Sequence, residues 1–559
     1  MSSTFFGLET AKRGMNAQRY GLQTTAHNIA NSNTPGFSRQ RVNLSPTSAF
    51  PTAGMNQPSI PGQIGTGVEG GSVQRVRDQF LDVQFRSRAS DSGFWHASYK
   101  SFERMEDIFN ETFKSPELEA QSSNISKQLN QFWNAWSDLA SGKENQSVLK
   151  EEANTIVESF NGVARDLVET RGQIKEEIDA TSREVNALLD AINQINVQIR
   201  SVEPHGYIPN DLYDKQDALI DELSNLMEIS VTRSPSGGQA SPVAEGAATI
   251  TMLGANGNKV NLVTYNNPSD LAEVSIQYED NSDFGAVAGI TITKSSETVE
   301  MTAENLAKGE WSGLIKAFGY VSEEDGTESI EGDYVWALNQ LTEVAQAFAR
   351  EVNAVHSIGY KSPSANGQME LGGNFFDFSN DGMPFSFSVN QEILANANNI
   401  ASLGVNVESL EDPSAYQSLL NGSPVDYAAI QAFLSDATNF KEGVPKAITG
   451  NHTNAQLISS IRDVKVSFGE ESKQIGTFYR DFIGQLGTKG KQAAQNYVNS
   501  DLLLFSIDSR RQEVSNVSMD EELTNMIQFQ HAYNAAARML TVTDEMLDRI
   551  INGMGVVGR

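Results

Sequence analysis

The chain has 559 residues, a formal net charge of -30 and no cysteine. Binding nucleic-acid phosphates needs concentrated lysine and arginine, so the acidic charge argues against such a partner. The lack of cysteine excludes a disulfide scaffold, a thiol nucleophile and a cysteine-ligated metal. Neither a secretory signal nor a run of roughly 18 apolar residues is visible. The sequence alone therefore predicts a cytoplasmic protein unless another export route exists.

The first predicted element is a helix that covers residues 4–29. Small and apolar residues recur there in alternating steps of four and three, which is the pattern of a heptad seam. The seam contains Thr4, Leu8, Ala11, Met15, Gln18, Leu22, Thr25 and Ile29. The basic residues on this helix would suit a membrane surface, but its apolar face is too poor. We therefore expect it to pair with another helix.

The stretch HNIANSNTPGFSRQRV, residues 27–42, predicts the end of this helix and a tight turn. Asparagine tolerates the left-handed conformation of a helix C-terminus, and a residue before proline is pushed out of the helical region. Pro35 and Gly36 suit the central positions of a type II turn, after which Phe37 could pack against the helix end. The predicted turn residues are Asn33, Pro35, Gly36 and Phe37.

Further helices are predicted in the middle of the chain. Apolar residues keep helical spacing over residues 160–202, and Pro204 and Gly206 end this run. The same spacing recurs over residues 338–355. It also recurs over residues 457–504, where we expect breaks at the glycines.

Two segments of different character interrupt the helices. Residues 232–246 are rich in serine, glycine and proline and predict a linker. Alternating apolar residues follow, and Asn256-Gly257 is a strong hairpin signal, so residues 231–305 predict a small inserted antiparallel β-domain. Residues 361–445 are rich in glycine, asparagine, serine and aspartate, and we expect a second, mixed insertion there.

The last predicted element resembles the first. A second heptad seam runs through Met526, Phe529, Tyr533, Ala536, Leu540, Thr543, Leu547 and Ile550. Ser518 and Glu521 fit a capping box at the start of this helix, and Asn552-Gly553 fits its end. The two terminal seams therefore predict helices that pair with each other.

Together these elements predict an α+β multidomain protein with nested domains. The N- and C-terminal helices would pair as a coiled coil, next to a helical-bundle layer, with the β-rich inserted outer domains furthest away. The expected terminal coiled-coil domain is 1–45 with 515–559, and the mainly helical domain is 46–230 with 306–360 and 446–514. The alternative is a series of separate α and β domains.

No residue pattern predicts an active site. Residues 65–70, GTGVEG, match G-x-G-x-x-G, but Pro58 and Pro61 spoil the strand that a dinucleotide fold needs before it. A loop leading into a strand is the favoured interpretation. The six histidines are scattered, as polar helix positions would be, and the acidic residues 323–333 lack the spacing of a calcium loop. We predict no catalytic residue, no cofactor and no metal.

The two ends of the chain resemble a known family. HNIANSNTPGFSRQRV strongly resembles the N-terminal signature of bacterial flagellar axial proteins, the family of rod, hook and hook-associated proteins. Residues 515–555 look like the matching C-terminal signature, with E-E-L, F-Q, Y-N-A-A-A-R and T-D-E-M-L in order. The turn segment and residues 345–376 are most similar to the hook-associated members.

This resemblance implies a structural subunit of a helical tube, at the junction between the flagellar hook and filament. The two seams would carry the assembly contacts of the inner wall, and the β-domains would face outward. The implied partners are further copies of the chain, the neighbouring hook protein and hook-associated protein 3, and an export chaperone at the C-terminal helix. Type III export would place the protein outside the cell, on the flagellum, without a cleaved signal peptide.

Other functions compete with this interpretation. A hook or rod subunit of the same family would share both seams, and only its place in the assembly distinguishes it. A secreted adhesin on a coiled-coil stalk would suit the acidic charge and the β-insertions, but it does not need both seams to act together. An enzyme fits least, because it requires a polar cleft with converging titratable groups. We expect neither a nucleic-acid partner nor insertion into a membrane.

Overall fold

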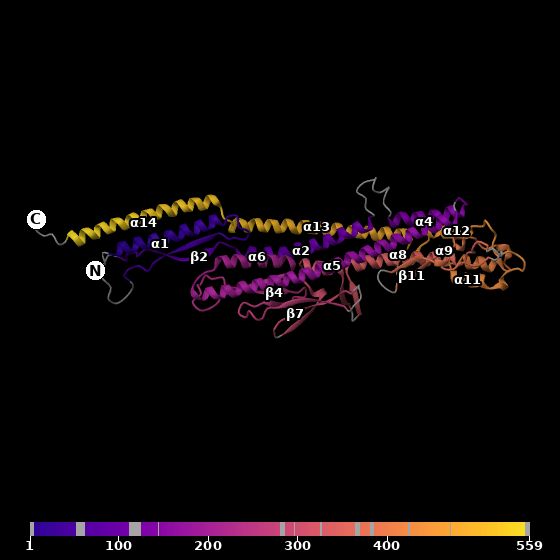
Figure 1. The fold of residues 1–559 in the computed structure, drawn as a ribbon, viewed down its shortest axis with the longest axis horizontal. Helices are drawn as coiled ribbons and strands as arrows, with labels where there is room; N and C mark the ends of the chain where they lie inside the picture. The colour runs from indigo at the N-terminus through magenta and orange to yellow at the C-terminus, as the bar shows by residue number, and fades with distance from the viewer. Residues whose placement is uncertain are drawn as a thin grey trace.

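The computed structural model describes residues 5–51, 62–110, 124–143, 145–279, 285–295, 297–324, 327–363, 369–380, 385–422, 425–469 and 471–553. The predicted residues Thr4, Pro58 and Pro61 lie outside these ranges. The molecule is elongated, and the N- and C-terminal helices lie together at one end (Figure 1). The fold is of the predicted α+β class, with helices predominating.

The longest helices run along the length of the molecule (Figure 1). They are α1 (Phe6–Ala30), α2 (Gln79–Phe109), α5 (Gln146–Val202), α8 (Asp333–His356), α13 (Ile475–Ser515) and α14 (Met519–Gly553). Shorter helices are α4 (Ile125–Ala140), α6 (Asn210–Leu226), α7 (Glu310–Phe318), α9 (Gln391–Ala395), α10 (Pro413–Leu420), α11 (Tyr427–Ser435) and α12 (Thr453–Ser460). The predicted end of the central helix is confirmed, because α5 stops at Val202 and Gly206 follows in the left-handed region with a φ of 83°.

The breaks expected at glycines over residues 457–504 are found at Gly469, which follows β13 (Val466–Phe468) with a φ of 55°, but they were wrong for the glycines inside α13. The helix is continuous through Gly484 and Gly490, although a glycine inside a helix costs about 1 kcal/mol. Helix α13 packs along α2. A Cβ atom at Gly490 would lie 2.4 Å from the Glu106 carboxylate, so that side chain would have to move. Ahead of α13, residues 461–474 leave the helical pattern and include a short β-hairpin.

The strands form several small sheets. A three-stranded sheet has the order β3 (Ile229–Ser234), β4 (Ala247–Leu253), β5 (Lys259–Val263). A five-stranded sheet contains β6 (Glu273–Tyr278), β7 (Val287–Thr293), β8 (Thr298–Thr302), β9 (Tyr320–Glu324) and β10 (Thr327–Glu331). The two-stranded sheets are β1 (Gln40–Pro46) with β2 (Val68–Arg75), β11 (Phe376–Ser379) with β12 (Ser386–Val389), and β13 (Val466–Phe468) with β14 (Glu471–Lys473). All pairs are antiparallel except for a parallel contact between β7 and β9.

The β-rich part of the chain keeps the predicted hairpin but differs from the predicted insertion of residues 231–305. Strands β4 and β5 are joined at Asn256-Gly257, where Gly257 has a φ of 82°. The strands form two sheets, and the second continues past residue 305 because β9 and β10 join it after α7. These two strands are polar, so no alternation of apolar residues marks them in the sequence.

One hydrophobic core joins the helical and β-rich parts. Buried residues of α5, α8 and the two larger sheets belong to the same cluster. Asn186 of α5 exchanges two hydrogen bonds of 2.8 Å with the backbone of Val274. Asn196, further along α5, exchanges two of the same length with the backbone of Ala248. The sheets are therefore packed directly on α5 and share its core.

A second, smaller core lies in and directly beside the segment predicted as a mixed insertion, residues 361–445. It is built around Tyr360, Leu410 and Ile430. Phe387 of β12, from the same segment, belongs to the main core instead. The segment is therefore divided between two cores, a division that its composition did not indicate.

The buried side chain of His356, at the end of α8, creates an acid-sensitive contact beside this second core. Its Nδ1 lies 2.7 Å from the carbonyl oxygen of Gly373, and its Nε2 accepts a hydrogen bond of 2.8 Å from the backbone N–H of Ala401. A protonated ring could not accept this second bond. Burial lowers the pKa of His356 from 6.5 to about 4.

We expect the stability of the protein to fall as the pH decreases from 6.5 to 4, because the unfolded chain then binds more protons at His356 than the folded protein does. Between pH 7 and pH 5 the free energy of unfolding should decrease by about 2 kcal/mol from this group. Urea unfolding at both pH values checks the prediction. The decrease should be smaller in His356→Gln and unchanged in His205→Gln, which alters an exposed histidine. An equal decrease in all three proteins would contradict it.

Candidate assembly site

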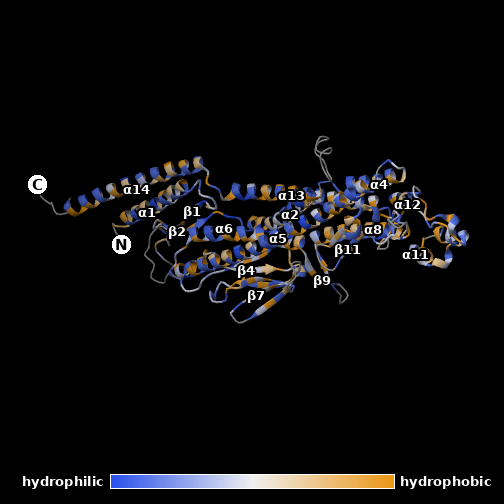
Figure 2. Cartoon of the chain, turned by 45° about the vertical axis from the view of Figure 1, so that its right-hand side comes forward, coloured by the Kyte–Doolittle hydropathy of each residue, from blue (hydrophilic) through white to orange (hydrophobic). Residues whose placement is uncertain are grey.

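The two terminal helices, α1 and α14, lie side by side and run antiparallel (Figure 1, Figure 2). A Cβ atom added at Gly14 would lie 3.9 Å from the Cβ of Ala536. One added at Gly21 would lie 2.9 Å from the ring of Phe529, which is closer than real Cβ contacts allow. These facing positions are seven residues apart on both helices, and Gly7 continues the series. Glycines at heptad spacing therefore bring the two helices close together.

The predicted N-terminal seam lies beside these glycines. Ala11 and Thr25 are buried. The other described members are half-buried, namely Leu8, Met15, Gln18, Leu22 and Ile29. The glycines that face α14 lie one position before three of these seam residues, Leu8, Met15 and Leu22. Sequence reasoning missed this because it followed the apolar residues, although the heptad repeat of glycines is visible in the sequence.

The predicted C-terminal seam lies on the side of α14 that faces α1. Leu547 is buried, while Ile550 is exposed. The other members are half-buried, namely Met526, Phe529, Tyr533, Ala536, Leu540 and Thr543. Close packing is therefore confined to part of the seam. Phe529 fills the space above Gly21, whereas Ile550 lies outside the contact between α1 and α14.

A second apolar face of α14 is open to solvent. Its large side chains are each at least 45% exposed, namely Leu523, Ile527, Met539, Val542 and Met546. Figure 2 shows hydrophobic residues recurring along this helix at the edge of the molecule. No part of the chain that the structure describes covers these side chains. Exposed apolar surfaces of this kind are typical of protein–protein interfaces.

The predicted turn follows directly after α1. The backbone N–H of Phe37 donates a 3.2 Å hydrogen bond to the carbonyl oxygen of Thr34, and Gly36 has a φ of 77°. The ring of Phe37 lies back against the helix end, with its centroid 5.4 Å from that of His27. Asn33 and Pro35 are exposed. The turn sends the chain from α1 into β1, which packs beside it.

A buried polar anchor ties α1, β1 and α14 together. The side chain of Asn28 exchanges hydrogen bonds of 2.8 and 2.9 Å with the backbone of Gln40, and also donates to Glu522 over 3.1 Å. Glu522 is only 2% exposed and accepts a second hydrogen bond, of 2.8 Å, from Arg39. Glu521, which we expected in a capping box, also pairs with Arg39, at 2.7 Å. Sequence reasoning missed the role of these residues, because a polar contact between distant segments leaves no periodic signal.

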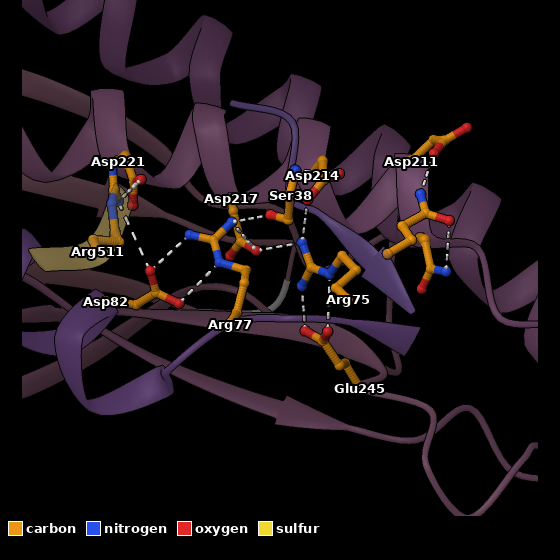
Figure 3. A network of polar contacts seen from close by, with 12 residues as sticks. Ser38, Arg75, Arg77, Asp82, Asp211, Asp214, Asp217, Asp221, Glu245 and Arg511 are labelled. Atoms are coloured by element: carbon orange, nitrogen blue, oxygen red, sulfur yellow. Dashed lines mark hydrogen bonds and ion pairs between the residues drawn. The ribbon is translucent and has the colours of Figure 1, made fainter. Parts of the chain in front are cut away.

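A larger cluster of charges joins the β1–β2 hairpin to the body of the molecule, by which we mean the helical and β-rich parts that share the main core (Figure 3). At its centre, one carboxylate of α6, that of Asp217, lies 2.7–3.1 Å from the guanidinium groups of Arg75, Arg77, Arg86 and Arg233. Burial alone would raise the pKa of Asp217, but the four guanidinium groups hold it well below its usual value. The side chain therefore stays ionised and bound to all four.

The candidate cofactor motif has a structural explanation. Residues 65–67 lead directly into β2, which begins at Val68 within the motif, so a strand takes the place where a dinucleotide fold has a helix. Among the described residues, no group of three or more histidine, aspartate or glutamate side chains is placed to hold a metal ion. In the same residues we find no helix whose length and apolarity would let it span a membrane.

Three protein families match different parts of the chain. Residues 8–37, which cover most of α1 and the turn, match the family described as flagella basal body rod protein. Residues 509–553, which include α14, match the flagellar basal body rod FlgEFG protein C-terminal family. Residues 115–376 match the helical domain of the flagellar hook-associated protein FlgK.

Flagellar hook-associated protein 1 of Bacillus subtilis is 36% identical to this chain over 563 residues, and the alignment covers 100% of both proteins. The chain belongs to the flagellar hook-associated protein 1 family. The hook-associated protein 1 sequences of Salmonella typhimurium and Escherichia coli are each 22% identical, over 97% and 98% of this chain and 98% and 99% of theirs. The flagellar hook junction protein FlgK from Burkholderia pseudomallei shares the fold, with a TM-score of 0.53 over 78% of this chain and 100% of that one, at 13% identity. The resemblance to flagellar axial proteins is confirmed, and the hook-associated protein 1 family is a family of structural flagellar proteins.

Proposed function

We propose that this protein is a structural subunit of the hook–filament junction, and that it assembles with copies of itself through α1 and α14, paired as a coiled coil. The observation that carries the proposal is the exposed apolar face of α14, whose other face already packs on α1. A helix that is apolar on two faces, and packs one of them within its own subunit, has the other face available for a second subunit. A contact between this face and a different surface of the next copy would be heterologous, and heterologous contacts build rings or helical tubes.

The proposal also names partners and a location. The hook protein and hook-associated protein 3 would bind at the two ends of the junction. An export chaperone would cover the apolar face of α14 before assembly, because an exposed stripe of this kind favours aggregation. Type III export would deliver the chain to the outside of the cell without a cleaved signal peptide. The membership of the chain in a flagellar family supports this route.

Ile527→Asp should abolish assembly and leave the folded subunit intact. Ile527 is 56% exposed, so a charge there meets water in the free subunit but would be buried without a partner in an assembled one. Its neighbour Gln528 is exposed and polar, so Gln528→Asp is a matched control. We expect the free energy of unfolding of both variants to stay within about 0.5 kcal/mol of the wild-type value. Sedimentation and electron microscopy measure assembly, and normal assembly of Ile527→Asp would contradict the role of this face.

The place of the protein in the flagellum is tested by deleting its coding sequence from a motile parent and imaging the cells by electron microscopy. Hooks without filaments, with flagellin released into the medium, are the expected result. Loss of the hook itself would indicate a hook or rod subunit. Filaments of normal length would reject the junction role and favour a secreted adhesin.

A further inference from the structure

The methionines that the structure describes fall into three groups by exposure. The buried ones lie in the body of the molecule, namely Met105, Met227, Met252 and Met301. The half-buried ones are Met15, Met369 and Met526. Among the described residues every exposed methionine lies on α14, namely Met519, Met539 and Met546. The chain has no cysteine, so the most accessible sulfur atoms in the described part of the chain are on this helix.

Met539 and Met546 lie on the open apolar face of α14. Their side chains are 61% and 60% exposed, and their spacing of seven residues is about two helical turns, so they lie on the same side of the helix. Val542 lies between them on this face. An α14 that separates from α1 would expose both side chains further, so their accessibility before assembly does not depend on the helix pair.

A thioether of this accessibility reacts with hydrogen peroxide without help from other side chains. A sulfur lone pair attacks one peroxide oxygen and the O–O bond breaks. The oxygen now bound to sulfur gives its proton to the departing hydroxide, which leaves as water. The sulfur loses two electrons and the peroxide gains them, so thioether and peroxide become sulfoxide and water. The product is a polar, chiral side chain in place of an apolar, flexible one.

The sulfoxides would act on assembly and not on the fold of the body. In the free subunit their oxygens would meet water, while the methionines of the body are shielded, as Met105 is at 0% exposure. In an assembled subunit the same oxygens would be buried on an apolar contact. Burying a polar group without a hydrogen-bond partner is unfavourable. Oxidation at Met539 and Met546 would therefore weaken the contact that α14 offers to its neighbour.

We propose that Met539 and Met546 form a modification site at which a peroxide oxidant switches off assembly of the subunit. The switch is reversible, because methionine sulfoxide reductases A and B return the two sulfoxide epimers to methionine. The site rests on the proposed function, since it acts through the apolar face of α14 that we assign to assembly. It deepens that function by naming a chemical condition under which a free subunit is not incorporated.

Two purified full-length variants test the site. The first, Met519→Leu/Met526→Leu, keeps Met539 and Met546. The second adds Met539→Leu and Met546→Leu and is the matched control, because leucine is apolar and close to methionine in volume. Each is treated with hydrogen peroxide until free methionine, added as a reference, is fully oxidised. Mass spectrometry of peptides gives the oxidised fraction at each position, and cosedimentation with hooks isolated from the deletion strain measures assembly.

In the first variant we expect Met539 and Met546 to be converted to sulfoxide while Met105 and Met252 stay largely reduced. Its binding to hooks should fall at least about tenfold, and the two reductases added together should restore it. The second variant should bind equally well before and after peroxide. Far-ultraviolet circular dichroism of the body should not change in either.

Three results would overturn the oxidation site. They are an equal loss of binding in both variants, unchanged binding of a first variant that is fully oxidised at Met539 and Met546, and retention of reduced sulfur at both positions after the treatment. Untreated subunits that do not bind the hooks would instead contradict the proposed function. The untreated samples therefore separate a failure of the junction role from a failure of this proposal.

Discussion

Asp217→Ala is expected to lower the free energy of unfolding by about 3–5 kcal/mol, the typical cost of removing one partner from a buried ion network. Asp217 is 4% exposed, and four guanidinium groups lie within 3.1 Å of its carboxylate. Without this charge the four arginines would be buried with too few partners. The remaining carboxylates of the cluster, on α2, α6 and the loop before β4, already bind arginines of their own.

Urea unfolding followed by far-ultraviolet circular dichroism measures this loss. Asp217→Asn should lose less than Asp217→Ala, because the amide oxygen can still accept hydrogen bonds from the arginines. Glu222→Gln, on the exposed face of the same helix, should unfold as the wild type does. A change below about 0.5 kcal/mol in Asp217→Ala would show that the cluster is not required for folding.

Gly21→Leu is the second substitution with a large expected effect, because it should separate α1 from α14 and abolish assembly. Even a Cβ atom at this position would lie 2.9 Å from the ring of Phe529, and a leucine side chain extends further. Overpacking of this kind costs about 1–3 kcal/mol, which the half-buried contact between two terminal helices cannot easily absorb. The body of the molecule, with its separate core, should remain folded.

Gly14→Ala is the matched control, since its Cβ would lie 3.9 Å from the Cβ of Ala536, an ordinary contact distance. Alanine also favours a helix over glycine by about 1 kcal/mol, so this variant should pair and assemble at least as well as the wild type. Limited proteolysis of α14 and sedimentation of assembled protein distinguish the two variants. Protection of α14 and normal assembly in Gly21→Leu would show that the close approach at Gly21 is not needed.

The elements that the sequence predicted well depend on neighbouring residues. Helical spacing over residues 160–202 with Pro204 after it, and the hairpin at Asn256-Gly257, are found where they were expected. In each case the signal lies within a few residues, because helix periodicity and turn conformation are set by local backbone geometry. The two terminal signatures likewise sufficed to identify the family.

The features that sequence reasoning missed connect distant segments. Asp217 binds Arg75 across 142 positions, and Asn28 binds Glu522 across 494. With 41 basic and 71 acidic residues in the chain, no spacing rule selects these pairs from the many that are possible. The addition of β9 and β10 to the second sheet was missed for the same reason. The residues of these strands do not themselves indicate which strand they pair with.

The sequence by itself therefore determined the terminal helices, the turn between α1 and β1, and the family, since these features are written in local patterns. Only the tertiary structure decided which face of α1 touches α14, how the sheets divide, and which charges meet on α6. Helix periodicity indicates that a face is apolar, but the close approach of two backbones at Gly21 and the pairing of buried charges at Asp217 exist only once distant segments have been packed together.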